Sequence, residues 1–224
     1  MNRKPVIAMD GFSSTGKSSI SKEIAKKLGL IHLDTGALYR GITYYALIEC
    51  RSKEMSINLE KLYSRFDQIE LEFRQNETEL ELYLNGRNIA MEIRSPEVSD
   101  HVSYIAKQAP VRDFLLSTQR HIAKKGGVIM DGRDIGTTVL PEADYKFFLT
   151  ASIDERTNRR YLELLSFGQQ TSKEEVKKNL AQRDKMDSER EVSPLRQADD
   201  AILIDNTTLT KEQTIALILS HIAS

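Results

Sequence analysis

Apolar and polar residues follow one another in blocks whose periods predict an α/β protein. Short apolar runs bounded by polar residues or glycine indicate strands buried on both faces of a sheet. We expect core strands at 6–9, 30–33, 128–130, 145–149 and 202–204. Apolar residues at helical spacing, with charged residues between them, predict amphipathic helices. These helices are expected at 20–28, 37–50, after Pro96, and at 111–124, 153–167, 173–190 and 211–222. The alternation predicts a parallel sheet with helices on both faces.

The period changes from helical to alternating between residues 69 and 86. Ile69, Leu71 and Phe73 alternate with polar residues, and the same pattern recurs at residues 80–84. Asn85-Gly86 is a strong turn signal. Because half of these positions are polar, one face of the resulting sheet should be exposed to water. The segment therefore predicts a small antiparallel sheet inserted into the α/β chain, whereas residues 51–66 carry no interpretable motif.

Composition and charge limit the classes of protein to which the chain can belong. Its 224 residues are 40% apolar and 29% charged, which suits one compact domain without disulfides, and Cys50 has no second cysteine to pair with. The 32 basic and 33 acidic residues give a net charge of -1, which argues against a generally basic surface for nucleic acid. The apolar run at 5–9 is too short for a secretory signal, and no run suits a membrane span. We expect a cytoplasmic monomer that binds neither nucleic acid nor membrane.

A phosphate-binding loop follows the first expected strand. The residues from Gly11 to Ser18 match G-x-x-x-x-G-K-[ST], with a strand before them and a helix after them. Glycines let backbone N–H groups point at an anion, and the helix N-terminus adds partial positive charge. Lys17 would reach the β- and γ-phosphates of a purine nucleoside triphosphate, and the Ser18 hydroxyl would bind Mg²⁺. The expected nucleotide-binding residues are Gly11, Phe12, Ser13, Ser14, Thr15, Gly16, Lys17, Ser18 and Ser19.

Arginines paired with nearby carboxylates indicate a second substrate that carries a phosphate. Arg133-Asp134, Arg183 with Asp187, and Arg190 form this set, and the guanine-reading Asn-Lys-x-Asp run of GTPase switches is absent from the sequence. Arginine suits a bidentate grip on phosphate, although any single exposed arginine is more often a solvated charge. Together with the phosphate loop, the set favours a small-molecule kinase over a switch.

Four motifs resemble those of bacterial cytidylate kinases, in that family's order and spacing. They are Asp10 to Ser18, Leu33-Asp-Thr-Gly-Ala-Leu-Tyr-Arg40, Asp131-Gly-Arg-Asp-Ile-Gly-Thr-Thr-Val139 and Arg183-Asp-Lys-Met-Asp-Ser-Glu-Arg190. The similarity extends over essentially the whole chain. It implies a single three-layer P-loop kinase domain over 1–224, in which the small antiparallel sheet enlarges the region that binds the nucleoside monophosphate. The implied regions are a core (about 1–35, 111–150 and 195–224), a monophosphate-binding region (about 36–110) and a helical lid (about 151–194).

The resemblance implies transfer of the γ-phosphoryl group of ATP to CMP or dCMP, with Mg²⁺. It assigns the acceptor phosphate to Arg40, Arg133 and Arg190, the cytosine edge to Ser103, Arg112 and Asp134, and the sugar side to Arg183 and Asp187. Thr35 stands where the family usually has serine and keeps a hydroxyl near the sugar or phosphate. Phe12 stands where proline is common, which puts only the rigidity of the loop in question. The implied catalytic residues are Lys17, Arg133, Arg190 and, from the lid arginines 156, 159 and 160, Arg159.

Asp131 and Tyr39 each keep two interpretations, whereas the histidines and Cys50 have one. Asp131 is either a general base or Mg²⁺ partner, or a structural residue that orders the phosphate loop by accepting hydrogen bonds. The four histidines show no metal-binding spacing, so we interpret each as a surface or core residue. Cys50 is expected to be a small buried apolar residue. Tyr39 either packs against the acceptor or belongs to the core.

Three alternatives to a CMP kinase remain open. The protein could phosphorylate another small acceptor, such as UMP or shikimate. It could be a non-catalytic ATP-binding regulatory module that presents its lid to a partner protein. Finally, the arginine-rich segment 156–196 could bind RNA, although its interleaved acidic residues and its lack of an aromatic stacking platform weaken this interpretation.

Overall fold

The computed structural model describes residues 3–52, 56–75, 80–124 and 126–222. The chain divides into two compact units, which we call the core unit (Met1–Leu33 with Ala123–Ser224) and the inserted unit (Asp34–Ile122). Each unit has a hydrophobic core of its own. Among the helices of the described ranges, none combines the length and the apolar character that crossing a membrane would require.

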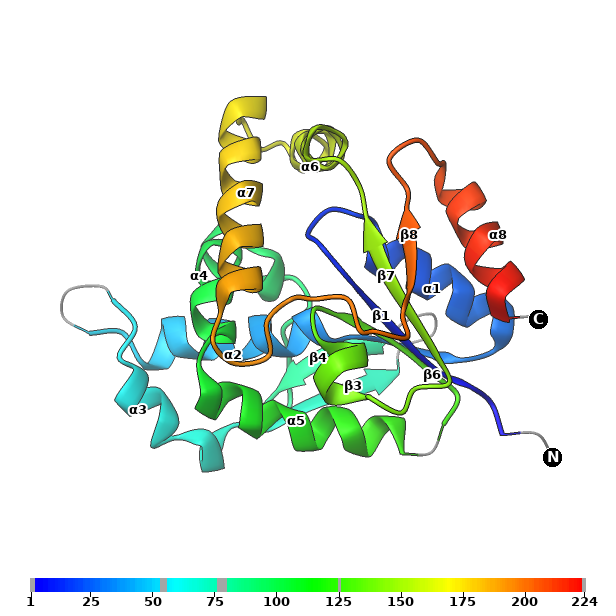
Figure 1. Ribbon diagram of the computed structural model, residues 1–224. Coiled ribbons are helices and arrows are strands. Elements are labelled where there is room, and N and C mark those ends of the chain that lie inside the picture. Colours follow the sequence, from blue (N-terminus) through cyan, green and yellow to red (C-terminus); the bar gives the residue numbers. More distant parts are fainter. Residues whose placement is uncertain (1–2, 53–55, 76–79, 125, 223–224) are drawn as a thin grey trace. The chain divides into compact units, whose positions relative to one another are not determined.

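A five-stranded sheet forms the centre of the core unit, in the order β2-β6-β1-β7-β8 (Figure 1). β1 pairs in parallel with both β6 and β7, and β7 pairs in parallel with β8. The five predicted core strands and their parallel arrangement are therefore confirmed. The bounds are β1 Val6–Gly11, β2 Ile31–Asp34, β6 Val128–Gly132, β7 Tyr145–Thr150 and β8 Ile202–Asp205.

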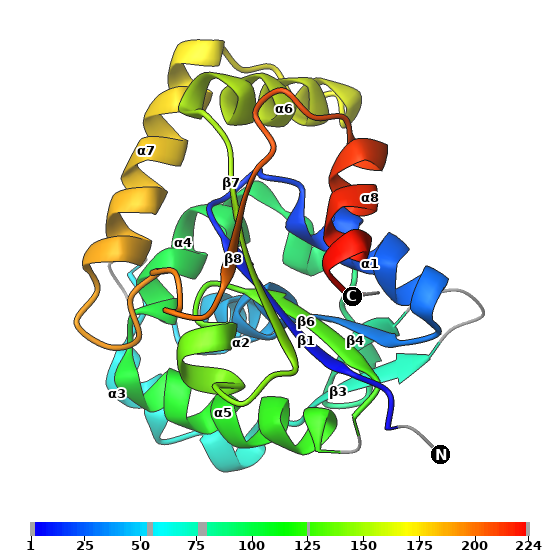
Figure 2. The ribbon, with the colours of Figure 1, turned by 45° about the vertical axis from the view of Figure 1, so that its right-hand side comes forward.

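Helical segments lie on both faces of this sheet, as predicted. On one face, α1 (Lys17–Leu28) and α8 (Lys211–Ile222) lie side by side (Figures 1 and 2) and pack on buried side chains such as Ile7 and Phe147. The opposite face carries Asp10 and Lys146, and a π-helical segment, η3 (Ile135–Val139), lies against it. The sequence pattern did not predict η3, because five residues are too few to show a helical period.

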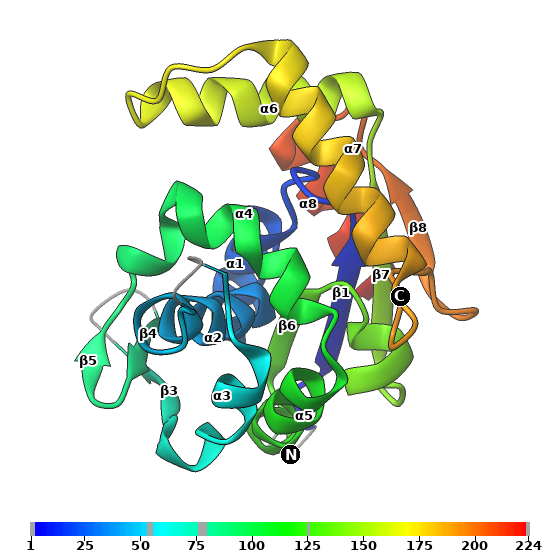
Figure 3. The same cartoon turned by 90° about the vertical axis from the view of Figure 1, so that its left-hand side faces the viewer.

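Two charged helices follow β7 within the core unit. They are α6 (Ile153–Ser166) and α7 (Lys173–Glu189), which contact each other (Figure 3) and agree with the predicted ranges to within one residue. A capping box starts α7, since Ser172 Oγ accepts from the Glu175 backbone N–H and the Glu175 carboxylate accepts from the Ser172 N–H. The cap fixes where α7 begins, and therefore which of its residues share a face.

The inserted unit contains the small antiparallel sheet, in the order β3-β4-β5. The predicted antiparallel pairing is confirmed, with Leu71 opposite Leu84 and Phe73 opposite Leu82. The Asn85-Gly86 turn joins β4 to β5, a two-residue strand that was not predicted. The bounds are β3 Leu71–Gln75, β4 Leu80–Leu84, β5 Arg87–Asn88, α2 Thr35–Glu49, α3 Leu59–Tyr63, η1 Phe66–Gln68, η2 Glu92–Arg94, α4 Pro96–Ala106 and α5 Ala109–Ala123.

The core of the inserted unit is built largely from α2 and from the helices and strands that pack on it. Leu38, Ile42, Leu82 and Ile105 are fully buried there, and Figure 3 shows α4 beside α2. Cys50 at the end of α2 belongs to the same cluster, which confirms its interpretation as a small buried apolar residue.

Candidate phosphate-binding and phosphoryl-transfer site

Positive backbone angles shape the loop between β1 and α1. Gly11 has φ 146° and Gly16 has φ 88°, while Ser14 adopts φ 60°. A Cβ atom at Gly11 would lie 2.0 Å from the carbonyl oxygen of Leu149, so only glycine fits beside β7 at this position. The loop therefore curls directly into the N-terminus of α1, where backbone N–H groups and the helix dipole favour an anion.

Lys17 is buried beneath this loop. Its ammonium donates to the carbonyl oxygen of Phe12, and its Nζ lies 3.4 Å from Thr15 Oγ1. Burial lowers the pKa of Lys17 well below its usual value, and the positive charge of Arg133 lowers it further. A polyphosphate would counter the second of these effects and favour the charged ammonium. The electrostatics of Lys17 therefore suit an anionic ligand.

Ser18, Asp131 and His32 form a hydrogen-bonded chain beside the loop. Ser18 Oγ donates to Asp131 Oδ2 over 2.6 Å, and His32 Nε2 lies 2.6 Å from Asp131 Oδ1. Asp131 is buried at the end of β6, and both of its carboxylate oxygens are engaged. This geometry favours the loop-ordering interpretation of Asp131. His32, interpreted from the sequence as a surface or core residue, is partly buried, and its ring contacts the carboxylate that reaches the phosphate loop.

The hydroxyl of Ser18 suits a metal ion that is also bound to a nucleotide. A hydroxyl has one donor and two lone pairs, so donation to Asp131 leaves its oxygen able to ligate a cation. Among the described ranges, no group of three or more His, Cys, Asp or Glu side chains could hold a metal ion by itself. A metal at Ser18 would therefore need the phosphate oxygens of the nucleotide as further ligands.

Arg133 connects the phosphate loop to α7. Its Nε donates to Asp187 Oδ2 over 2.9 Å, and its Nη2 donates to Ser13 Oγ over 2.7 Å. The carboxylate of Asp187 is nearly buried, whereas the arginine keeps about a fifth of its side chain exposed. The guanidinium is thus held at the loop by a charged partner while part of it stays accessible.

Asp10 anchors the backbone that follows Arg133. Its two carboxylate oxygens accept from the N–H groups of Ile135 and Gly136, over 2.8 and 2.7 Å. Burial raises the pKa of Asp10 from 3.8 to about 6; the two hydrogen bonds oppose this rise, whereas the charge of Asp134 adds to it. Asp10 therefore holds the start of η3, and with it the Arg133-Asp134 pair.

Arg190 and Asp134 form an almost completely buried ion pair. Arg190 Nη2 lies 3.3 Å from Asp134 Oδ1, and the two side chains are 4% and 5% exposed. Arg190 Nε also donates to the carbonyl oxygen of Ser193, just beyond the end of α7. The structure thus joins the motif after β6 to the motif at the end of α7, two segments whose arginines were predicted to bind one phosphate.

Two arginines of α6 contact carbonyl oxygens of the phosphate loop. Arg156 Nη1 donates to Asp184 Oδ2 over 2.6 Å and to the Ser13 carbonyl over 3.3 Å, and its guanidinium lies 5.1 Å from the centre of the Phe12 ring. Arg159 Nη1 donates to the Thr15 carbonyl over 3.4 Å. Both arginines are therefore tied to the loop.

Asn206 adds a further contact to the loop from the end of β8. Its side-chain amide donates to the Thr15 carbonyl over 2.9 Å, and its own oxygens accept from Arg159. Sequence reasoning missed this residue, although a polar side chain directly after a parallel core strand is a usable signal. It missed the role of His32 because a lone histidine in a short strand gives no such signal.

The pairing of these arginines argues against RNA binding by segment 156–196. Arg156 pairs with Asp184, Arg159 with Glu155, Arg160 with Glu163 and Arg190 with Asp134. A nucleic-acid surface needs basic side chains that are available to phosphates. Arg183, predicted to bind the sugar side, is partly buried on α7 one helical turn before Asp187.

The remaining predicted site residues belong to the inserted unit. Thr35 is the buried first residue of α2, Arg40 is partly buried on the same helix, and Ser103 is buried on α4. Arg112 on α5 is buried, donates to the Ala106 carbonyl over 3.1 Å, and places its guanidinium 5.3 Å from the centre of the Tyr39 ring. Tyr39 is therefore a core residue that also supports a predicted site residue.

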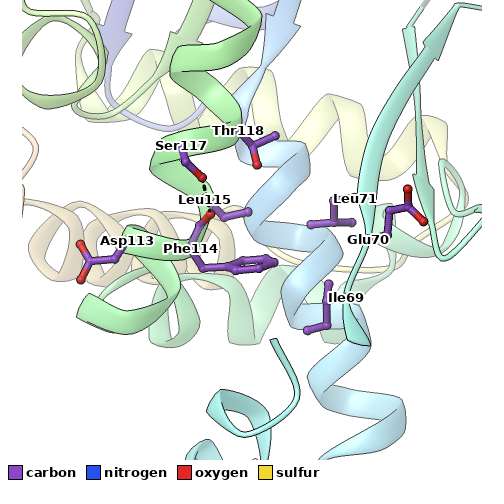
Figure 4. Close-up of a pocket in the computed structure, with 8 residues that line it drawn as sticks. All are labelled: Ile69, Glu70, Leu71, Asp113, Phe114, Leu115, Ser117 and Thr118. Carbon is purple, nitrogen blue, oxygen red and sulfur yellow. Dashed lines mark hydrogen bonds between the residues drawn. The ribbon is translucent and has the colours of Figure 1, made fainter. Parts of the chain in front are cut away.

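A cavity of about 360 Å³ lies elsewhere in the inserted unit, between the start of β3 and α5 (Figure 4). The ring of Phe114 points toward Leu71 and Ile69, and the carboxylates of Asp113 and Glu70 lie on opposite sides of this group (Figure 4). None of the predicted site residues lines it. Its carboxylates do not suit a phosphate, so we do not place a nucleotide there.

A phosphate loop between a buried parallel strand and a helix, with arginines and a buried lysine gathered around it, defines a P-loop nucleotide-dependent phosphotransferase. The family model for cytidylate kinase matches residues 7–224. The cytidylate kinases of Bacillus cereus strain ATCC 10987 and Bacillus thuringiensis strain Al Hakam are each 45% identical to the chain over 223 residues, covering 100% of it and 98% of each relative. The chain belongs to the cytidylate kinase family.

A solved structure agrees at the level of the fold. An uncharacterized protein from Eubacterium ventriosum superposes with a TM-score of 0.52, covering 99% of both chains at 10% sequence identity. At this identity the likeness concerns the fold alone.

Proposed function

We propose that the protein transfers the γ-phosphoryl group of ATP to CMP or dCMP and releases ADP with CDP or dCDP. The observation that carries this proposal is the contact of Arg133 with both Ser13 of the phosphate loop and Asp187 of α7. It ties an arginine of the expected acceptor site to the loop expected to hold the donor. Membership of the cytidylate kinase family supports the choice of acceptor, since the relatives carry that name.

The chemistry is a direct displacement at phosphorus. An oxygen of the acceptor's phosphate attacks the γ-phosphorus of ATP, the bond from that phosphorus to the β,γ-bridging oxygen breaks, and its electrons leave with ADP. Such a transfer requires alignment and neutralisation of charge rather than a covalent enzyme intermediate. Lys17 and Arg133 would supply positive charge beside the transferred group. Mg²⁺, held by Ser18 and phosphate oxygens, supplies additional charge neutralisation when bound.

Acceptor recognition follows from the groups that cytosine and a phosphate present. We assign the acceptor phosphate to Arg40, Arg133 and Arg190. Cytosine presents an N4 amino donor beside the N3 and O2 acceptors, so a carboxylate and a cationic donor complement it. We assign its edge to Ser103, Arg112 and Asp134, the sugar side to Arg183 and Asp187, and the sugar or phosphate to the hydroxyl of Thr35. The contact of Asp134 with Arg190 places this carboxylate beside an arginine that we assign to the acceptor phosphate.

The α6 arginines would complete the site on the donor side. Arg159 and Arg156 already contact carbonyl oxygens of the phosphate loop, so a small movement of α6 would bring their guanidinium groups toward the phosphates. Such closure excludes water, which would otherwise accept the phosphoryl group. We propose Arg159 as the catalytic member of this pair.

A coupled assay of ADP formation tests the proposal. CMP, dCMP, UMP, AMP, GMP and shikimate are supplied separately with Mg²⁺ and ATP. We expect the highest kcat/KM with CMP or dCMP. A higher value with UMP or shikimate would contradict the acceptor assignment. ADP formation that does not depend on any acceptor would indicate a regulatory ATPase instead.

A further inference from the structure

His32 is the outermost member of the hydrogen-bonded chain that reaches the phosphate loop from β2. The chain has two links of 2.6 Å each, from His32 Nε2 to Asp131 Oδ1 and from Asp131 Oδ2 to Ser18 Oγ. The three residues come from β2, β6 and α1, so the fold brings together residues that are as much as 113 positions apart. The Asp131 side chain is 3% exposed and that of His32 is 18% exposed.

The two links act on different oxygens of the Asp131 carboxylate. A carboxyl group rotates about a broad terminal torsion, and hydrogen bonds at both oxygens restrict that rotation. Hydrogen bonds to a buried carboxylate also lower the free-energy cost of burying it. The contact with His32 therefore helps to hold the carboxylate in the orientation that receives the Ser18 hydroxyl.

The orientation of Asp131 determines what the Ser18 hydroxyl can do. While Asp131 accepts the hydroxyl proton, the Ser18 oxygen keeps its lone pairs for a cation. If Asp131 turned away, the hydroxyl would rotate toward another acceptor, and its lone pairs would no longer have a fixed direction. A residue that fixes Asp131 therefore also fixes the metal-binding geometry of Ser18.

We propose that His32 is a positioning residue for metal–nucleotide binding: it locks Asp131, which in turn orients the Ser18 hydroxyl toward the Mg²⁺ that accompanies ATP. The proposal rests on the proposed function, because it takes the phosphate loop to bind Mg–ATP. It requires only an N–H on Nε2 of the imidazole ring, which the neutral ring can supply.

The chain offers a matched pair of substitutions. Glutamine has its amide nitrogen three bonds from Cβ, as is Nε2 in histidine, so His32→Gln can keep the donor in place. His32→Asn keeps a polar amide but is one carbon too short, and His32→Leu removes the donor. His121, exposed near the end of α5, provides the control substitution His121→Leu.

The test compares the affinity for ATP with and without Mg²⁺, measured by calorimetry on the full chain. Loss of an indirect partner of a metal ligand typically weakens metal binding by about tenfold or more. We therefore expect His32→Leu and His32→Asn to weaken Mg–ATP binding by about tenfold while leaving the affinity for ATP in EDTA unchanged. His32→Gln should restore most of the loss, and His121→Leu should match the wild type.

Other outcomes overturn the proposal. Equal weakening with and without Mg²⁺, or a lower Tm with an unchanged ratio of the two affinities, would make His32 a purely structural partner of Asp131. Should His32→Leu not fold, the comparison of His32→Gln with His32→Asn decides the matter in the same way. Failure of the proposed function is separate: it shows in the wild type, as absence of CMP-dependent ADP formation, whatever the His32 variants do.

Discussion

The buried carboxylate of Asp10 makes a sharp prediction about stability and pH. Its pKa is raised from 3.8 to about 6, chiefly because burial disfavours the ionised form. Between these two values the folded protein binds more protons than the unfolded chain. The free energy of unfolding therefore rises as the pH falls through about 6, which is the opposite of the usual behaviour of a paired carboxylate.

The substitution Asp10→Asn isolates this contribution. From the two pKa values, Asp10 alone should add about 2 kcal/mol to the free energy of unfolding of the wild type between pH 7 and pH 4.5. Asparagine does not titrate, so the variant lacks this gain. Its amide nitrogen also faces one of the N–H groups of Ile135 and Gly136, which costs about 1.5–3 kcal/mol. At pH 7 the wild type has to bury an ionised carboxylate, whereas the variant buries a neutral amide. This advantage of the variant roughly offsets the cost of the unfavourable amide contact, so the two proteins should have similar stability at pH 7.

Urea unfolding of both proteins at several pH values from 4.5 to 7 measures the effect. The measured quantity is the free energy of unfolding of the wild type minus that of Asp10→Asn. We expect this difference to be about 2 kcal/mol larger at pH 4.5 than at pH 7. Asp205→Asn is the control, because hydrogen bonds from Thr207 lower the pKa of Asp205 below 3.8 and its contribution is lost only at more acidic pH. A difference between wild type and Asp10→Asn that stays constant with pH would refute the reasoning.

Three further substitutions test the roles of individual side chains. Lys17→Ala should lower kcat by at least about 100-fold with little loss of Tm, because burial already lowers the pKa of this ammonium; near-normal kcat would contradict its role at the phosphates. Asp134→Asn should erode the preference for CMP over UMP, measured as the ratio of the two kcat/KM values; an unchanged ratio would remove base recognition from this residue. Phe12→Leu removes the ring beneath Arg156 and should raise the KM for ATP more than the KM for CMP, whereas equal changes in both would argue against a donor-side role.

The core sheet and the phosphate loop were predictable because their signals are local. Strands buried on both faces are uninterrupted apolar runs, and the loop has a fixed spacing between Gly11, Gly16 and Lys17. The short elements were not predictable in this way. β5 has two residues and η3 has five, so neither is long enough to show a period. They depend on contacts with distant residues, such as that of Asp10 with the N–H groups of η3.

In the site, the residue types could be predicted from the sequence, but the contacts between them could not. The arginines of the motifs after β6 and at the end of α7 were predicted from their chemistry, but their partners were not, since Asp187 lies 54 residues from Arg133 and Arg190 lies 56 residues from Asp134. Sequence neighbours suggested a different pairing, Arg133 with Asp134 and Arg183 with Asp187.

The exchange of partners has a functional consequence. Because the carboxylates are shared between the two motifs, Arg133 and Arg190 each depend on a residue from the other motif for their position. A substitution in α7 should therefore alter acceptor binding through Arg133 even where the substituted side chain does not itself touch the acceptor. Ser13 extends this dependence to the donor side, since its hydroxyl accepts from Arg133 and its carbonyl accepts from Arg156. The phosphate loop is thus a shared support for Arg133, which we propose for the acceptor, and for Arg156, which we propose for the donor side.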